Sequence, residues 1–214
     1  VNEIAKSYKQ SVDTAQKLNL TNYLGDHVFL GIKESYPFHP SIKDLYARFK
    51  ENPNFQQTRG MIRLMRQIIR RFYESGLADQ KSLINVFDID LNDKNTLAHI
   101  KQIKSSLDVA INYDLAQDGR AIAEIIDAQD TKNPYPYAQN FCKLLLMSSL
   151  NDLAHGLKGL TENEAVGYLC EPDIDINQYK KAFDAVRMQS WYLKEDNRGH
   201  FYFQNQKNLV AEMN

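Results

Sequence analysis

Apolar side chains return every three or four positions through most of this 214-residue chain, and that spacing limits it to one kind of secondary structure. The spacing places them on one face of an amphipathic helix. We therefore predict a mainly α-helical fold. The segments with this pattern are 3–18, 41–49, 95–112, 119–128, 141–157 and 175–189.

The pattern is interrupted most clearly at "DAQDTKNPYPYAQ", residues 127–139, which contain two prolines among polar residues. Proline lacks the backbone N–H and disfavours helix in the residue before it. We predict a boundary here, between residues 1–130 and 131–214. After the boundary, Thr161 and Glu164 have capping-box spacing, which predicts that a helix begins at Thr161.

Near the C-terminal end the period changes. "WYLKEDNRGHFYF", residues 191–203, contains two short aromatic segments on either side of a polar Asp-Asn-Arg-Gly turn, a pattern typical of a β-hairpin. Three predicted helices precede it in this part of the chain. Three helices followed by a hairpin is the order of a winged helix.

Composition excludes several classes of protein. The 26 Lys and Arg residues nearly balance 27 Asp and Glu residues, so total charge names no partner. No apolar run approaches the roughly 20 residues that cross a bilayer, and we expect no membrane contact. Cys142 and Cys170 lie far apart without a CxxC motif, so we predict neither a zinc site nor a disulfide framework. We also predict a cytoplasmic location, where thiols stay reduced.

Five arginines occur in "TRGMIRLMRQIIRRF", residues 58–72. On a helix, Arg59, Arg63, Arg66 and Arg70 fall within about 60° of one another, and Arg71 stands apart. Like charges at this spacing repel by a few tenths of a kcal/mol per pair, which an anionic partner would relieve. The alternative is a solvated face paired with local carboxylates. The side expected to pack into the core carries Ile62, Leu64, Met65, Ile68, Ile69 and Phe72.

Two motifs resemble a known family. "YPFHP", residues 36–40, precedes a predicted helix, and "FQQTRGMIRLM", residues 55–65, places Thr-Arg-Gly before the basic helix. Both are similar to the C-terminal part of large bacterial and archaeal AAA+-type ATPases known as domain of unknown function 499. Some of their relatives, including ATPases of BREX-type systems, act in phage defence. The order of the later segments also agrees over nearly the whole chain.

The resemblance implies a helical lid-type bundle in residues 1–130 and a small winged-helix domain with a C-terminal hairpin in residues 131–214. The chain contains no GxxxxGK[ST] loop to hold nucleotide phosphates. We therefore expect the nucleotide-binding domain upstream of Val1, as this chain's first partner. ATP and Mg²⁺ would bind only in the full-length protein, an ATPase, and the fragment alone would hold no cofactor and be inactive.

The resemblance also implies site residues. In the origin-recognition branch of such ATPases, Gly-x-x-Arg followed by apolar residues carries the second sensor, which contacts the γ-phosphate. "GMIRLM", residues 60–65, has this spacing, so Arg63 is the expected catalytic residue, with Arg59 second. His39, between Pro37 and Pro40, either lies near the nucleotide or fixes the turn of the chain. Because related ATPases often form rings, a homo-oligomer is expected of the full-length protein.

The winged helix invites a DNA-binding interpretation. Lys180, Lys181 and Arg187 occupy the helix that would enter the major groove, and Arg198 occupies the wing. Nearby aspartates offset these charges, so the basic footprint is weak and a protein partner is favoured over DNA.

Two hypotheses remain open. In one, the chain senses ATP and relays nucleotide state; in the other, it is a non-enzymatic DNA-binding or protein-interaction module. The first requires that Arg63 face a concave junction near residues 36–40. The second requires an open arginine stripe that binds DNA in a salt-dependent way.

Overall fold

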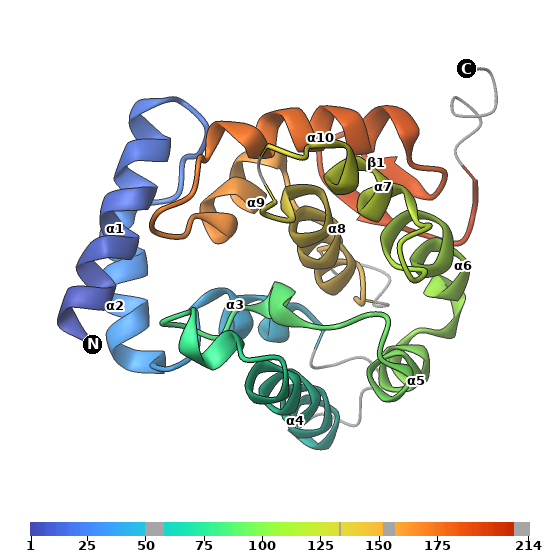
Figure 1. Cartoon of the computed structure of the whole chain (residues 1–214), viewed down its shortest axis with the longest axis horizontal. Helices are drawn as coiled ribbons and strands as arrows, with labels where there is room; N and C mark the ends of the chain where they lie inside the picture. Colours follow the sequence, from blue (N-terminus) through green and yellow to red (C-terminus); the bar gives the residue numbers. More distant parts are fainter. Residues whose placement is uncertain (50–57, 133, 152–156, 208–214) are drawn as a thin grey trace.

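The computed structural model describes residues 1–49, 58–132, 134–151 and 157–207, with the side chains of residues 49 and 58–61 excepted. It is mainly helical with one C-terminal hairpin, as predicted (Figure 1). The α-helices are α1 (Asn2–Lys17), α2 (Gly25–Ser35), α3 (Ser41–Phe49), α4 (Thr58–Glu74), α5 (Lys94–Ile103), α6 (Asp108–Ala110), α7 (Ile122–Gln129), α8 (Tyr137–Ser148), α9 (Glu162–Leu169) and α10 (Asn177–Gln189). The other elements are the 3₁₀ helices η2 (Leu77–Asp79), η3 (Val86–Asp88) and η4 (Ser105–Leu107), the π-helix η5 (Ile111–Leu115), and the strands β1 (Leu193–Glu195) and β2 (Phe201–Phe203).

Helix α8 lies at the centre of the molecule (Figure 1). Nearly every side chain along it is buried, and it packs against α7, α10, α9, η3 and β2. The hydrophobic cluster around it extends from Ala5 in α1 to Phe203 in β2. Burying one large apolar side chain contributes about 1.5–3 kcal/mol, so this helix anchors the segments on either side of it.

The N-terminal helices show the expected faces. Tyr8, Val12 and Ala15 of α1 are buried, and α2 lies beside α1 at one end of the molecule (Figure 1). Helix α3 begins at Ser41 and buries Ile42. These faces result from the period of three and four that the sequence displays.

The elements from α8 onward have the predicted order of three helices followed by a hairpin: α8, α9, α10, β1 and β2. Thr161 caps α9, and Glu164 reciprocates with a hydrogen bond from the Thr161 backbone N–H, as predicted. Just before α9, Leu160 exchanges two backbone hydrogen bonds with Phe201 of β2. Gly159 has φ of 73°, and a Cβ there would lie 2.3 Å from the Phe201 carbonyl oxygen. Glycine therefore allows this close approach, which adds a third extended segment to the hairpin.

The hairpin itself forms as predicted. Strands β1 and β2 pair antiparallel, with Lys194 opposite Tyr202, and Gly199 turns the chain with φ of 76°. Helix α10 packs against α8 with the expected face. The buried residues of this face are Ile176, Tyr179, Phe183 and Val186.

Two helix predictions were wrong in their bounds. The expected helix over 95–112 breaks at Lys104, whose backbone leaves the helical region with φ of -151° and ψ of 86°. Its Nζ donates to the Ser149 and Asn151 carbonyl oxygens at 3.1 and 3.3 Å. The expected helix over 141–157 begins earlier and ends at Ser148, and residues 152–156 lie outside the described part. Side-chain hydrogen bonds from Ser148 and Ser149 to the Leu145 carbonyl accompany this end. Both changes depend on contacts and side-chain bonds that the apolar period does not encode.

The two predicted parts contact each other extensively. Thr21 Oγ1 donates to the Asn163 carbonyl at 2.6 Å, and Tyr168 donates to Asp44 at 3.2 Å. The described residues between α7 and α8, 130–132 and 134–136, form no helix, where the prolines predicted a break. The division into residues 1–130 and 131–214 stays a prediction. None of the described helices is long and apolar enough to cross a lipid bilayer.

Candidate functional site

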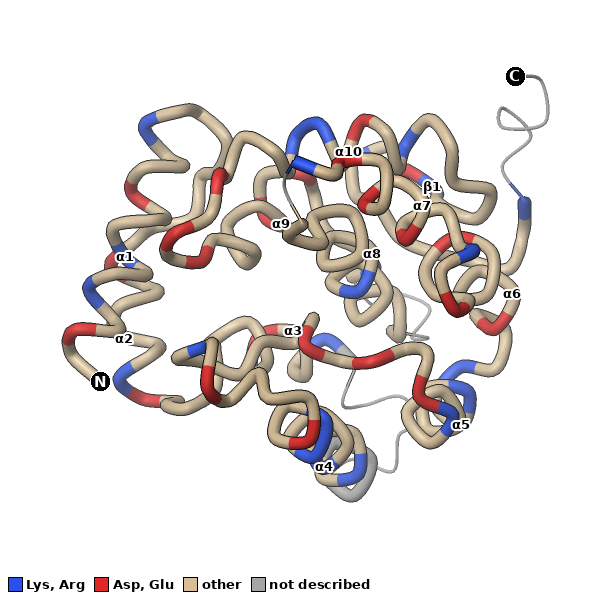
Figure 2. Tube along the Cα trace, in the orientation of Figure 1, with Lys and Arg blue, Asp and Glu red and all other residues tan. Residues whose placement is uncertain are grey.

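Helix α4 presents arginines to two different sides. Arg63, Arg66 and Arg70 are exposed, whereas Arg71 is half-buried and faces the interior. Arginine residues gather along this helix, which carries the blue of basic residues in Figure 2. The Arg59 side chain lies outside the described part of the structure. The inner side packs on the core through Leu64, Ile68 and Phe72.

The exposed arginines differ in their partners. Arg70 Nε donates to the Glu74 carboxylate at 2.7 Å, one helical turn away. Within the described part of the chain, the side chains of Arg63 and Arg66 have no hydrogen bond or ion pair. Local carboxylates therefore neutralise the C-terminal end of the stripe and leave its middle open to an anion.

Apolar side chains border this stripe. Ile62 is 62% exposed and Tyr73 is 68% exposed, on the same side of α4 as Arg66. The prediction that Ile62 packs into the core was wrong, because a position about 40° from Arg66 on the helix faces solvent. Arginine and aromatic residues are enriched at protein interfaces. We call Ile62, Arg63, Arg66, Arg70 and Tyr73 the α4 outer surface.

His39 lies in the core. It is 1% exposed, and its ring lies 5.9 Å from that of Tyr8. Its Nδ1 accepts the backbone N–H of Ser41 at 3.2 Å and lies 2.8 Å from the Ser41 hydroxyl, at the start of α3. Burial, together with the charge of Lys81, lowers the pKa of His39 to about 3. The His39 ring is neutral and buried, and it is hydrogen-bonded to the first residue of α3. This geometry agrees with the second of the two predicted roles, in which His39 fixes the turn of the chain.

The predicted nucleic-acid residues lie on the opposite part of the molecule. Lys180 and Lys181 are exposed on α10, and Arg198 is exposed in the hairpin turn. Arg187 is already paired with Glu195 at 2.9 Å. No described contact joins these residues to the α4 outer surface or to His39.

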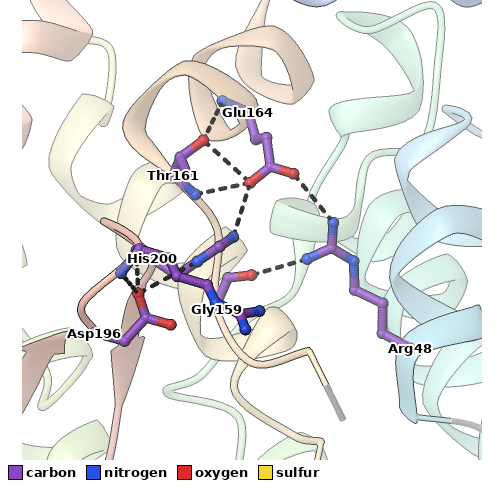
Figure 3. A network of polar contacts seen from close by, with 7 residues as sticks. Arg48, Gly159, Thr161, Glu164, Asp196 and His200 are labelled. Atoms are coloured by element: carbon purple, nitrogen blue, oxygen red, sulfur yellow. Dashed lines mark hydrogen bonds and ion pairs between the residues drawn. The ribbon is translucent and has the colours of Figure 1, made fainter.

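A polar network connects α3 with the segment from Gly159 to His200 (Figure 3). Arg48 Nη1 donates to the Gly159 carbonyl at 2.8 Å, and its Nη2 lies 3.5 Å from the Glu164 carboxylate. The same carboxylate accepts the Thr161 N–H at 2.8 Å and lies 4.0 Å from His200 Nε2. Glu164 thus contacts α3 and the start of α9 through hydrogen bonds, and the hairpin turn through a longer polar contact to His200.

Sequence reasoning missed a cluster of charges on the inner side of α4. Arg71 pairs with Asp90, and Lys81 pairs with Asp88 at 2.7 Å, around a cavity that Lys143 of α8 also lines. These residues are separated by up to 72 positions in the chain, so no motif spacing marks them. The available signal was Lys143 itself, the one charged residue in the apolar helix "FCKLLLM".

The cysteines and histidines give no metal site in the described residues, where no group of three or more metal-binding side chains occurs. Cys142 and Cys170 are free thiols in the core, as predicted for Cys142. Burial raises the pKa of both thiols, which makes them unreactive.

Comparison with known proteins identifies the family. No curated protein and no solved structure gives a match to this chain. Residues 2–141, which extend from α1 into α8 and include the α4 outer surface, match the family described as DUF499 second domain. The match covers more than half of the sequence. The chain therefore belongs to the DUF499 family.

Proposed function

We propose that this chain is the nucleotide-sensing, C-terminal part of a larger DUF499 ATPase. The α4 outer surface lies against an upstream nucleotide-binding domain of the same protein, and Arg63 contacts the γ-phosphate of ATP held there. ATP and Mg²⁺ bind to that domain, and the described residues supply no metal site of their own. The fragment alone does not hydrolyse ATP.

One observation supports this proposal: Arg63 and Arg66 are exposed and have no carboxylate partner among the described residues. The cavities lined by described residues between α2 and α3, beside α4 and beside α7 do not include Arg63, so in this proposal the upstream domain completes the concave junction that the sensor requires. A planar guanidinium that keeps its charge can donate to two phosphate oxygens at once. The bordering Ile62 and Tyr73 give the surface the mixed composition of a domain interface. Bare DNA contacts would need no such apolar border, since phosphate neutralisation supplies most of their affinity.

The network around Glu164 offers a route for the relay. Arg48 lies on α3, the helix that precedes α4, and it bonds both the Gly159 carbonyl and Glu164. A change in the position of α3 would therefore shift the start of α9 and the hairpin turn. The winged-helix segment then contacts a partner, which is a protein or DNA. The whole protein would act in phage defence or in DNA transactions.

The test is ATP turnover by the full-length protein. Arg63→Ala should lower kcat by roughly 10²- to 10³-fold, as loss of other preorganised charge-stabilising donors does. Arg63→Lys should restore only part of the rate, because a lysine lacks the planar fork. Arg120→Ala, at an exposed arginine outside the α4 outer surface, serves as the matched control and should retain wild-type turnover.

Wild-type turnover in Arg63→Ala would overturn the sensor assignment. The non-enzymatic alternative makes a different prediction. In that case the double variant Arg63→Ala/Arg66→Ala leaves ATP turnover unchanged and weakens duplex DNA binding. The slope of log K against log salt is then reduced by about 0.9 for each phosphate that the variant no longer neutralises.

A further inference from the structure

A cavity of about 360 Å³ lies between the C-terminal end of α4, the segment from η2 to residue 90, and the start of α8. In Figure 1 this segment runs between α4 and α8. The volume is at the lower end of the ~300–1,000 Å³ typical of small-molecule sites. Part of the wall is apolar, formed by Leu77, Phe87, Ile89 and Pro136. An apolar wall of this kind suits the body of a small organic ligand.

The acidic groups around the cavity already have donors. Asp88 accepts from Lys81 Nζ at 2.7 Å, and Asp90 accepts from Arg71 Nη2. The second oxygen of each of these carboxylates accepts a backbone N–H, at 2.7 and 2.9 Å. Behind them, Glu171 lies 3.2 Å from Lys81 Nζ. Each lining carboxylate therefore already has one donor on each of its two oxygens.

Lys143, which also lines the cavity, differs from these carboxylates because its charged group has no partner among the described residues. It shares one face of the first turns of α8 with Pro136 and Asn140, at sequence separations of seven and three, and all three line the cavity. Its Nζ has no hydrogen-bond or ion-pair partner in the described part of the chain. The rest of α8 packs into the core. The Lys143 side chain therefore borders the cavity and is only partly exposed to solvent.

A second donor at the cavity is also unmatched. Arg71 uses Nη2 to bind Asp90, but its Nε is buried and has no hydrogen-bond partner. A buried donor without a partner costs free energy that an acceptor would recover. Both unmatched charged groups that line the cavity are thus donors, which favours a ligand that carries acceptors and negative charge.

The charge state of Lys143 agrees with this geometry. Burial lowers the pKa of Lys143, and the nearby Asp90 and Asp88 only partly oppose the shift. An anion in the cavity would favour the charged ammonium and raise the pKa again.

We propose that this cavity binds a small organic anion, whose carboxylate or phosphate group pairs with Lys143 and accepts a hydrogen bond from Arg71 Nε, while its apolar body lies against Leu77 and Pro136. The site is separate from the α4 outer surface. Its ligand does not depend on the proposed ATPase function.

The test measures the acylation rate of each lysine in the full-length protein with N-hydroxysuccinimidyl acetate, resolved by peptide mass spectrometry. Four probes are compared: inorganic phosphate, acetate, phenyl phosphate and benzoate. They separate the contribution of the anionic group from that of an apolar body, and phosphate from carboxylate. The exposed Lys132 is the matched control in every sample.

We expect phenyl phosphate or benzoate to slow acylation of Lys143 in a saturable way and to leave Lys132 unchanged. The matching inorganic phosphate or acetate should require a higher concentration, because it lacks the apolar body. The proposal is overturned if none of the four probes slows Lys143 more than Lys132.

Two variants, with calorimetry of the protecting probe, locate the anion. Lys143→Met should weaken binding by roughly 10- to 100-fold, the effect of one charge-assisted hydrogen bond. Arg71→Lys keeps a charge near Asp90 and removes Nε, so it should weaken binding less. Unchanged affinity in Lys143→Met would place the anion elsewhere and overturn the proposal. The ATP turnover of Lys143→Met should equal that of wild type. The turnover measurement therefore distinguishes failure of the sensor proposal from failure of this anion site.

Discussion

On the outer side of α4, Arg63 and Arg66 are exposed and have no carboxylate partner among the described residues. On the inner side of the same helix, Arg71 pairs with Asp90 beside a cavity that the Lys81–Asp88 ion pair also lines. One residue type thus meets two environments that differ by a rotation about the helix axis. The unpaired outer charges are therefore available for binding, whereas most inner charges are needed by the fold.

The energetic consequences should differ accordingly. Exposed charges are hydrated, and their removal changes stability little. Buried charges depend on their partners, because each ion gave up its water on folding. Substitutions on the two sides of α4 therefore test whether the inner and outer charges differ in their contribution to stability.

The largest effect is expected at the centre of the inner cluster. Lys81→Met leaves Asp88 and Glu171, both nearly inaccessible, without their cation. Breaking a buried ion pair costs about 3–5 kcal/mol, and we expect that loss in the free energy of unfolding measured in urea. Lys43→Met, at an exposed pair with Glu34, is the control and should change stability by less than about 0.5 kcal/mol. Equal losses in the two variants would contradict a structural role for the inner cluster.

The next effect is a pH dependence from His39. Its pKa is lowered to about 3 by burial, together with the charge of Lys81, whereas an unfolded histidine titrates near 6.5. The unfolded state therefore binds the proton first, and stability falls as pH drops below about 6.5. Between pH 6 and 4 this group should account for a loss of about 2–3 kcal/mol. Unfolding curves of wild type and His39→Gln across this range measure it, and an identical pH slope in both proteins would refute it.

A smaller effect is expected at Arg71 itself. Its side chain and that of Asp90 are each about one-third exposed, so solvent screens the pair. Arg71→Met should lower the free energy of unfolding by about 1–2 kcal/mol, because it removes a charge-assisted hydrogen bond but leaves Asp90 access to water. A loss indistinguishable from zero would remove the distinction between the two sides of α4.

The smallest effect is expected on the outer side. Arg66→Ala should change stability by less than about 0.5 kcal/mol, and relief of repulsion along the stripe can make the change favourable. Thermal or urea unfolding, measured under the conditions used for Arg71→Met, gives the direct comparison. A loss above about 1 kcal/mol, on the order of that for Arg71→Met, would mean that the outer stripe has partners within the fold.

Much of the fold could be predicted from the sequence. The buried faces of α1 and α10, the cap at Thr161 and the hairpin around Gly199 follow from local patterns, and the structure confirms them. Local patterns suffice there because period, capping and turn chemistry all favour the same outcome.

The rest depends on contacts between distant segments. The break at Lys104 is accompanied by bonds to the carbonyls of Ser149 and Asn151, about 45 residues away, which no local pattern contains. Likewise Lys81 meets Glu171 only once α8 and α9 are in place. The arginine stripe was visible in the sequence, but the cavity behind it was not, because a cavity is a property of packing.

The most direct test of the account is the rate at which phenylglyoxal modifies each arginine of α4 in the full-length protein, with and without ATP. We predict that Arg63 and Arg66 react faster than Arg71 without nucleotide, and that ATP protects Arg63 while Arg71 stays slow. Equal rates for Arg63 and Arg71, with no effect of ATP on Arg63, would contradict both the division of α4 into two sides and the proposed sensor.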